Sequence, residues 1–292
     1  MERVLIAGET EPLAGGAVAC AGFSPTPVPA HLRDGVLVVD ETLPERLRAS
    51  LTRLSVGTRP VRIVLAPVGG VDPLGPDPYL QSATFLTAAA ALEAGVGVGL
   101  LTRGVPAKGF GALFSRYPGR IVAHVAFGPE ALEHGGAPSW SARLGTIAAL
   151  SAAGVPTWLR IDPAVPGQTD GADVLERWLA GAAAAGACGV VVAPLVLDDA
   201  ARAALADDPT VVDYYRPGRR RRRGVLPVPP AAYLPLERET ALMWRVRRVA
   251  QDHSLPTRLC RCARTGHGAC GLAGSPRPAM DEPRLPLLPA EA

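Results

Sequence analysis

Three cysteines and a histidine lie close together near the C-terminus, and they are the residues of this chain best suited to bind a metal. The pattern is Cys260-x-Cys262-x7-Cys270, with His267 inside the last interval. Thiolates and a neutral imidazole are the ligands that zinc takes in small structural sites. The spacing departs from paired Cys-x2-Cys, so these residues also fit unpaired, reduced thiols in a tail. Zinc binding is therefore a hypothesis with a plain alternative.

A second set of polar residues accompanies the apolar runs that predict strands. Arg160 and Asp162 stand at the end of one run, Asp72 follows another, and His124 lies within a third. Functional groups of parallel β/α folds gather beyond the carboxyl ends of the strands. We therefore expect these four side chains to lie near one another. They would hold a polar ligand, or they would form ion pairs that only stabilise the strand ends.

An arginine run carries most of the excess positive charge. Its members are Arg219, Arg220, Arg221, Arg222 and Arg223. Between residues 216 and 264 there are 13 Arg and three acidic residues, although the net charge of the whole chain is only +3. Such a segment binds nucleic-acid phosphates, or it is a solvated linker or a docking segment with an arginine-rich composition.

Several common catalytic signatures are missing from the sequence. Gly95, Gly97 and Gly99 do not complete a dinucleotide-binding fingerprint, because Leu100 and Arg103 stand where glycines are needed. There is no Walker-type Gly-Lys-Ser/Thr and no convincing Ser/His/Asp grouping. The sequence thus argues against a nucleotide-binding loop of either type.

Short, nearly continuous apolar runs alternate with Ala- and Leu-rich stretches, which predicts a parallel sheet covered by helices. Strands are predicted over 4–7, 61–66, 96–101, 121–126, 157–161 and 190–193, with an extra edge strand over 36–39. Helices are predicted over 44–54, 80–94, 109–116, 139–153, 172–185 and 236–251. Ser139 is expected to cap a helix, and Gly154, Gly186 and Gly189 are expected near helix ends. The expected fold is α/β, a partial (β/α)6 TIM-like barrel.

Composition divides the chain into three parts. Residues 1–200 are predicted to form the barrel, and residues 201–270 a basic, irregular Arg/Pro-rich extension with a helix and the Cys/His cluster. Residues 271–292 are predicted to form a Pro-rich disordered tail. No secretory signal and no apolar run of membrane-spanning length are recognised. These features favour a cytoplasmic protein that does not contact a membrane.

The loop after the first predicted strand resembles the cluster loop of radical S-adenosylmethionine (SAM) enzymes, particularly those similar to spore photoproduct lyase. It reads Glu-Pro-Leu-Ala-Gly-Gly-Ala-Val-Ala-Cys-Ala-Gly-Phe over residues 11–23. The family has roughly Asn-Pro-Tyr-Arg-Gly-Cys-x3-Cys-x2-Cys, whose thiolates hold a [4Fe–4S] cluster that binds SAM. Gly16, Cys20 and Phe23 fall on the three cysteine positions, so one thiolate remains.

Further segments resemble the family in order and spacing across residues 4 to 197. Residues 71–76 are similar to its Thr-Asp-Pro-Tyr-Gln-Pro, 101–104 to Thr-Lys-Ser, and 137–144 to Ala-Pro-x4-Arg-Leu. Residues 160–170 are similar to Pro-Ile-Ile-Pro-Gly-x-Asn-Asp. The resemblance implies SAM and a [4Fe–4S] cluster as cofactors. The residues that it places on the cofactor-binding side are Cys20, Thr102, Arg103, Arg143 and Asp162. Arg103 replaces a Lys that contacts the SAM carboxylate in relatives.

Two functional hypotheses follow. The first is a radical SAM-like pseudoenzyme that binds a ligand or a partner, such as an active radical SAM relative. The second is an active, divergent radical SAM enzyme with DNA-repair-like or nucleotide chemistry, whose displaced cluster uses Cys20 and the C-terminal cysteines. A decayed sequence without a selected function is a third, weaker reading. A cluster needs thiolates, and neither Gly16 nor Phe23 supplies one.

Overall fold

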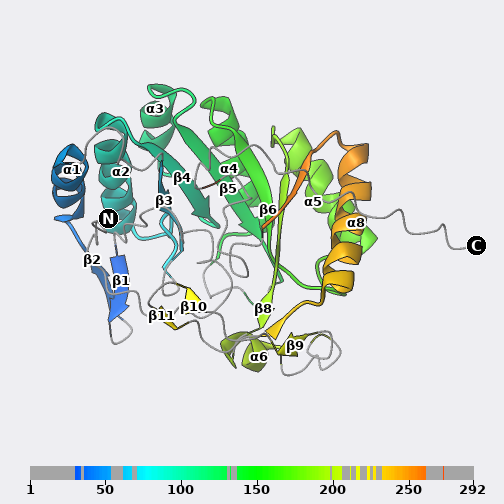
Figure 1. The fold of residues 1–292 in the computed structure, drawn as a ribbon. Coiled ribbons are helices and arrows are strands. Elements are labelled where there is room, and N and C mark those ends of the chain that lie inside the picture. The colour runs from blue at the N-terminus through cyan, green and yellow to red at the C-terminus, as the bar shows by residue number, and fades with distance from the viewer. Residues whose placement is uncertain are drawn as a thin grey trace, which may run out of the picture.

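A parallel six-stranded sheet forms the centre of the chain in the computed structural model (Figure 1). The structure describes residues 30–33, 36–53, 62–67, 71–129, 132, 137–197, 199–205, 211, 215–217, 222–223, 226–227, 232–260 and 272. The strand order is β13-β7-β6-β5-β4-β3. The strands are β3 (Arg62–Leu65), β4 (Gly97–Thr102), β5 (Ile121–Phe127), β6 (Thr157–Ala164), β7 (Val190–Pro194) and β13 (Thr257–Leu259). Because every neighbouring pair is parallel, all six carboxyl ends lie along one edge.

Helices follow the sheet along one side (Figure 1). They are α1 (Leu43–Arg53), α2 (Pro78–Glu93), α3 (Gly109–Ser115), α4 (Trp140–Ala152), α5 (Ala172–Ala184) and α8 (Leu236–Asp252). The larger apolar core joins these helices to the outward-facing side chains of the strands. β4, β5 and β6 are buried on both faces, as their nearly continuous apolar runs predict. The fold class expected from the sequence is confirmed.

Short elements gather at one end of the sheet (Figure 1). They are β8 (Val196–Leu197), α6 (Asp199–Ala204), β9 (Arg216–Pro217), β10 (Arg222–Arg223), β11 (Leu226–Pro227) and β12 (Ala232–Tyr233). β12 pairs with both β8 and β9, and β10 pairs with β11. These small antiparallel pairs therefore lie beside the carboxyl edge of the main sheet.

A smaller core covers the inner face of the sheet, opposite the helices. Its members are Val64, Ala66, Leu101, Val122, Ala126, Trp158, Val191, Ala193, Cys260 and Leu272. The strand members alternate with residues of the outer core, since successive side chains of a strand point to opposite faces. Leu272 is the exception, because it lies beyond the last strand and still packs on this face. A Cβ atom at Gly99 would lie 2.4 Å from the Leu272 carbonyl oxygen, so the missing side chain at Gly99 makes room for that contact.

Helix ends follow the expected chemistry with one difference. The Ser139 hydroxyl accepts a hydrogen bond from the Ala142 amide at 3.3 Å and caps α4, as predicted. Gly154 and Gly186 have φ values of 77° and 86° and end α4 and α5. Gly189, by contrast, allows a close contact between the chain and a ring, because a Cβ there would lie 2.3 Å from the Trp158 ring. That glycine is needed for sheet packing rather than for a helix end.

Five of the six predicted strands are confirmed, and the strand predicted over 4–7 lies outside the described residues. The segment 36–39 does form a strand, β2 (Val36–Val39). Its predicted place at the edge of the main sheet is wrong, because it pairs antiparallel with β1 (Ala30–Arg33) in a separate two-stranded sheet. The sixth strand of the main sheet, β13, has no counterpart among the predicted strands.

The segment assigned to a basic extension contributes directly to the sheet. α8 packs against α5, β7 and β13, and β13 extends the sheet beyond β7, with Thr257 opposite Val190. This helix and strand add one more β/α unit after β7. No described helix combines the length and the apolar character that a membrane crossing requires.

Candidate functional site

Asp72 joins the ends of β3 and β4. Its Oδ1 accepts hydrogen bonds from the Leu74 amide at 2.9 Å and from the Thr102 hydroxyl, and its Oδ2 accepts from the Arg103 amide at 2.6 Å. Burial raises the pKa of the Asp72 carboxyl, and these donors oppose that shift. One carboxylate thus holds two strand-end loops together.

The turn after β4 depends on a glycine. The Gly104 amide donates to the Thr102 hydroxyl oxygen at 2.8 Å. A Cβ at Gly104 would lie only 1.9 Å from the Leu74 carbonyl oxygen, which is far inside van der Waals contact. The loop after β4 can therefore approach the loop after β3 only with glycine at this position.

A second set of contacts continues from β4 to β13. The Arg103 Nη2 donates to the Asp162 carbonyl oxygen at 2.9 Å. The Arg160 Nε donates to Asp162 Oδ2 at 2.6 Å, with both side chains at most 2% exposed. The Arg160 Nη2 lies 3.5 Å from Cys260 Sγ, and the Cys260 amide bonds the Val192 carbonyl at 2.7 Å. Hydrogen bonds therefore link the ends of β3, β4, β6, β7 and β13, and we call this set of residues the strand-end network.

His124 lies on the inner face one strand away from Arg160. It is fully buried, and its ring centroid is 6.4 Å from that of Trp158. Burial, followed by the positive charge of Arg160, lowers the pKa of His124 to about 3. The ring is therefore neutral at ordinary pH. Within the described part of the chain, neither ring nitrogen has a hydrogen-bond partner.

Arg143 has a different position from the other predicted residues. Its Nε donates to the Pro138 carbonyl at 2.8 Å and its Nη1 to the Ala126 carbonyl at 3.0 Å. The guanidinium carbon also lies 5.8 Å from the centre of the Phe127 ring. Arg143 thus ties the start of α4 to the end of β5. A cofactor contact for this residue stays a prediction.

Of the predicted metal ligands, only Cys260 is described. It is buried at the end of β13 and faces the inner side of the sheet. Cys262, His267 and Cys270 lie outside the described residues, as does Cys20. Among the residues that are described, no group of three His, Cys, Asp or Glu side chains is arranged to hold a metal. Zinc binding by the C-terminal cluster remains a prediction.

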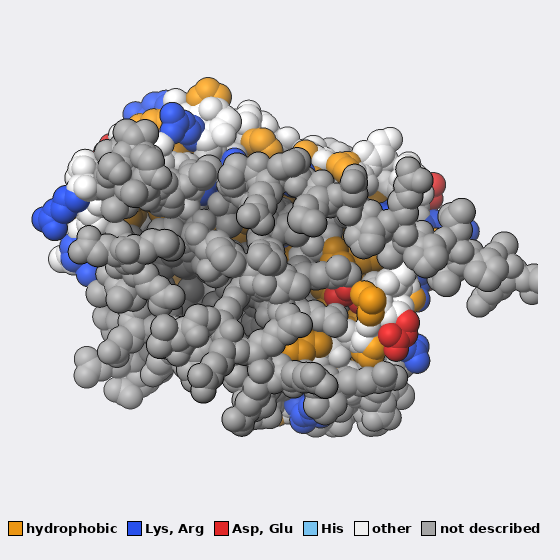
Figure 2. Space-filling model, viewed as in Figure 1, with side chains coloured by type: hydrophobic (Ala, Val, Ile, Leu, Met, Phe, Trp, Pro, Cys, Tyr) orange, Lys and Arg blue, Asp and Glu red, His pale blue; other side chains and the backbone are white. Residues whose placement is uncertain are grey.

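The arginine run lies only partly within the described residues. Arg222 and Arg223 form β10, and Arg219, Arg220 and Arg221 lie outside the described ranges. On the face shown in Figure 2, described Lys and Arg side chains gather over α1 and α3. The expectation of a nucleic-acid surface at the run is left as a prediction.

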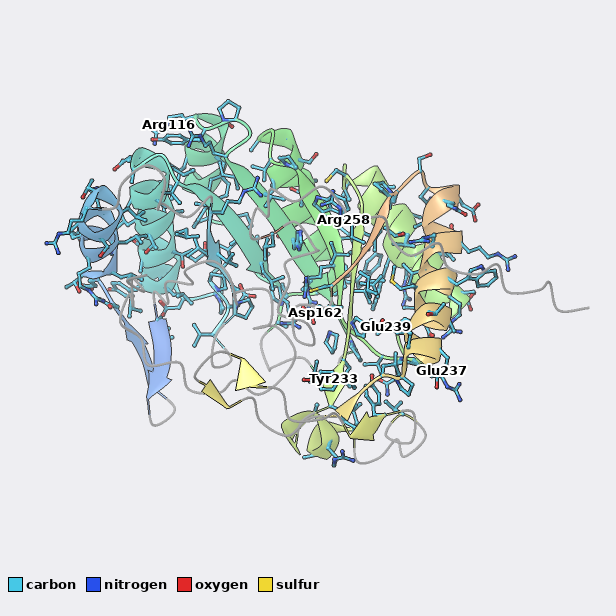
Figure 3. The ribbon with its side chains drawn as sticks, in the orientation of Figure 1. Arg116, Asp162, Tyr233, Glu237, Glu239 and Arg258 are labelled. Carbon is cyan, nitrogen blue, oxygen red and sulfur yellow. The ribbon has the colours of Figure 1, made fainter. Side chains whose placement is uncertain are left out.

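Trp158 and Arg258 belong to this face, although the sequence does not single them out. The Arg258 guanidinium lies 4.2 Å from the centre of the Trp158 ring, and Figure 3 shows Arg258 on β13 with Asp162 nearer the strand ends. Arg258 escapes notice because β13 has only three residues and one of them is charged. In the sequence, Trp158 looks like any other apolar residue of the strand β6. Only its place on the inner face distinguishes it.

A parallel, helix-covered sheet with polar groups at its carboxyl edge defines the chain as a partial β/α barrel. No family model and no curated protein matches the sequence. Two solved structures of spore photoproduct lyase, a radical SAM enzyme, match the fold. A cysteine-to-alanine mutant with dinucleoside spore photoproduct gives a TM-score of 0.53 at 12% identity, covering 76% of this chain and 68% of that one. A tyrosine-to-phenylalanine mutant gives a TM-score of 0.54 at 13% identity, covering 89% of this chain and 80% of that one. The chain therefore has a radical SAM-like fold.

Proposed function

We propose that this protein is a binding barrel with a radical SAM-like fold that does not assemble a [4Fe–4S] cluster on its N-terminal loop. It binds a polar ligand at the carboxyl edge of its sheet and acts as a pseudoenzyme. The observation that carries the proposal is the strand-end network, in which Asp72, Thr102, Arg103, Asp162 and Arg160 connect β3, β4 and β6.

The donor set of the N-terminal loop supports the same conclusion. Gly16 and Phe23 stand at two of the three cysteine positions, and neither side chain can donate an electron pair to iron. Cys20 alone does not fit a four-iron cluster. We therefore derive no radical step for this chain.

A second candidate is an active enzyme whose cluster is displaced toward the C-terminal cysteines. Cys260 favours it, because its sulfur faces the inner side of the sheet beside Arg160 rather than the outer, helical side. In this reading Cys20, Cys262 and Cys270 would supply further thiolates. DNA-repair-like or nucleotide chemistry would then be the default substrate class, by analogy with the fold alone.

Anaerobic reconstitution with iron and sulfide separates the two candidates. The binding-barrel proposal expects no four-iron EPR signal from folded protein. A stable signal that SAM perturbs would overturn it, and would assign the cluster if the signal disappears in Cys20→Ala and Cys260→Ala. Cys188→Ala is the matched control, because Cys188 is an exposed free cysteine remote in sequence from both groups.

A barrel without its own radical chemistry would act on or with another component. We propose an active radical SAM relative as its partner, with nucleic acid bound through the arginine run as the other candidate. Co-purification of the intact chain with such a relative, with and without nuclease treatment, tests both. Association that survives nuclease supports the protein partner, and association lost with nuclease supports nucleic acid.

A further inference from the structure

The inner face of the sheet carries three guanidinium groups. Arg62, Arg160 and Arg258 alternate along their strands with outward-facing residues, so each belongs to the inner side. Their positive charges act on the same spot, because each lowers the pKa of His124, whereas the Cys260 sulfur acts in the opposite direction. The strands of the main sheet carry three guanidinium groups on this face and a single carboxylate, Asp162, which pairs with Arg160. The excess of positive charge favours an anion at this face.

Neutral His124 lies on the same face and feels the charge of all three. A neutral imidazole has one N–H donor and one acceptor. Among the described residues neither nitrogen is hydrogen bonded, although the side chain is 0% exposed. A buried polar group without a partner is costly, and native structures rarely keep one without a reason. A ligand that accepts the N–H would supply that reason.

Trp158 and Arg258 extend the same surface to its open side. The Arg258 guanidinium stacks over the indole at 4.2 Å, and its side chain is exposed while Trp158 is buried. The β4 side of the inner face is already filled, since Leu272 packs there against Gly99. His124, Arg160 and Arg258 lie on the other side of this face, on β5, β6 and β13. Of the three, only Arg258 is exposed, so an anion would reach the face from the β13 side.

We propose that the inner face between β5 and β13 binds the anionic group of a small ligand, a phosphate or a carboxylate, through His124, Arg160 and Arg258. This inference rests on the proposed binding function and names its ligand class. The guanidinium groups supply charge-assisted hydrogen bonds. His124 adds a neutral N–H donor, which selects among anions by the position of their oxygen atoms rather than by their charge.

The test is isothermal titration calorimetry on the full chain, purified with chelator and never reconstituted with iron. Inorganic phosphate is the probe in one arm and malonate in the other, at constant ionic strength set with sodium chloride. We expect saturable binding in at least one arm, and the tighter arm identifies the anion. Arg258→Gln and His124→Leu should each weaken it about tenfold or more, which is the effect of losing about 1.4 kcal/mol.

Arg248→Gln is the matched control. Arg248 also stacks on a tryptophan, Trp244, at 5.6 Å, but on the exposed side of α8. It should leave the affinity unchanged. Arg258 is exposed, so its variant keeps the test valid if His124→Leu does not fold.

Two results would overturn the inference: no saturable binding of either probe by folded wild-type protein, or equal weakening by Arg248→Gln and Arg258→Gln. Neither result bears on the pseudoenzyme proposal, which fails only if reconstitution yields a SAM-responsive cluster. The two failures are therefore distinguishable.

Discussion

Replacing His124 with leucine should remove an acid-induced loss of stability that the wild-type protein shows. In the folded chain burial lowers the pKa of His124 from 6.5 to about 3. Protons therefore bind the unfolded chain more readily than the folded one between these two values. The unfolding free energy therefore loses nothing to His124 above about pH 6.5. It falls as the pH drops toward 3, because protonation of His124 then favours the unfolded chain.

The size of the effect follows from the two pKa values. At pH 4.5 the unfolded histidine is almost fully protonated and the folded one is not. The difference is about two pKa units, or about 3 kcal/mol of unfolding free energy. Burial raises the pKa of Asp72, so its contribution has the opposite sign and is lost as pH rises through that pKa. It is common to both proteins and cancels in their difference.

Urea denaturation followed by circular dichroism at pH 4.5, 5.5 and 7.5 measures the effect. At pH 7.5 His124→Leu should be more stable than wild type by about 1–2 kcal/mol, since it removes a buried polar group without a described partner. The gap should widen by about 3 kcal/mol at pH 4.5. Thr84→Val is the control, because it removes another buried polar atom without a described partner but one that does not titrate, and it should keep the wild-type acid response. Parallel pH profiles for wild type and His124→Leu would refute the reasoning.

Three further predictions concern the strand-end network and the packing of the inner face. Gly104→Ala should lower stability by about 3 kcal/mol or more, because its Cβ would lie 1.9 Å from a carbonyl oxygen. Gly145→Ala in α4 is the control, because nothing lies within 4 Å of its Cβ, and it should raise stability by up to about 1 kcal/mol. Equal effects of the two variants on urea unfolding would contradict the close approach of Gly104 to Leu74. Arg160→Met leaves the buried Asp162 carboxylate without its ion-pair partner and should cost about 3–5 kcal/mol. Adding Asp162→Asn should recover part of that loss, and simple additivity would argue against coupling. Gly99→Ala should displace Leu272, whose carbonyl oxygen lies 2.4 Å from the position of the new Cβ, and lower the urea midpoint; an unchanged midpoint would count against that contact.

Much of the barrel could be predicted from local patterns. The strands β3 to β7 are apolar runs, and the helices between them have the composition and end signals that helices need, such as Ser139. β13 could not be predicted this way. Its three residues include a charge, and they form a strand because β7 offers a free edge to pair with. A strand defined by its neighbour leaves little mark on its own sequence.

The candidate site divides in the same manner. The expectation was that Asp72, Arg160, Asp162 and His124 gather near the strand ends. Hydrogen bonds join the first three, and His124 lies one strand from Arg160 without a described hydrogen bond. The structure adds the links between them through Thr102 and Arg103. These links depend on the register of neighbouring strands, which no local pattern encodes.

The sequence by itself determined the alternation of the strands β3 to β7 with their helices, the absence of thiolates at Gly16 and Phe23 and the residue types at the strand ends. These are properties of single segments, read from polarity, spacing and side-chain chemistry. Only the tertiary structure decided that Cys260 faces Arg160, that Arg258 stacks on Trp158 and that Leu272 fills the space beside Gly99. Each of these contacts joins residues that are far apart along the chain. They arise because sheet pairing and burial bring together segments whose own sequences carry no signal for one another.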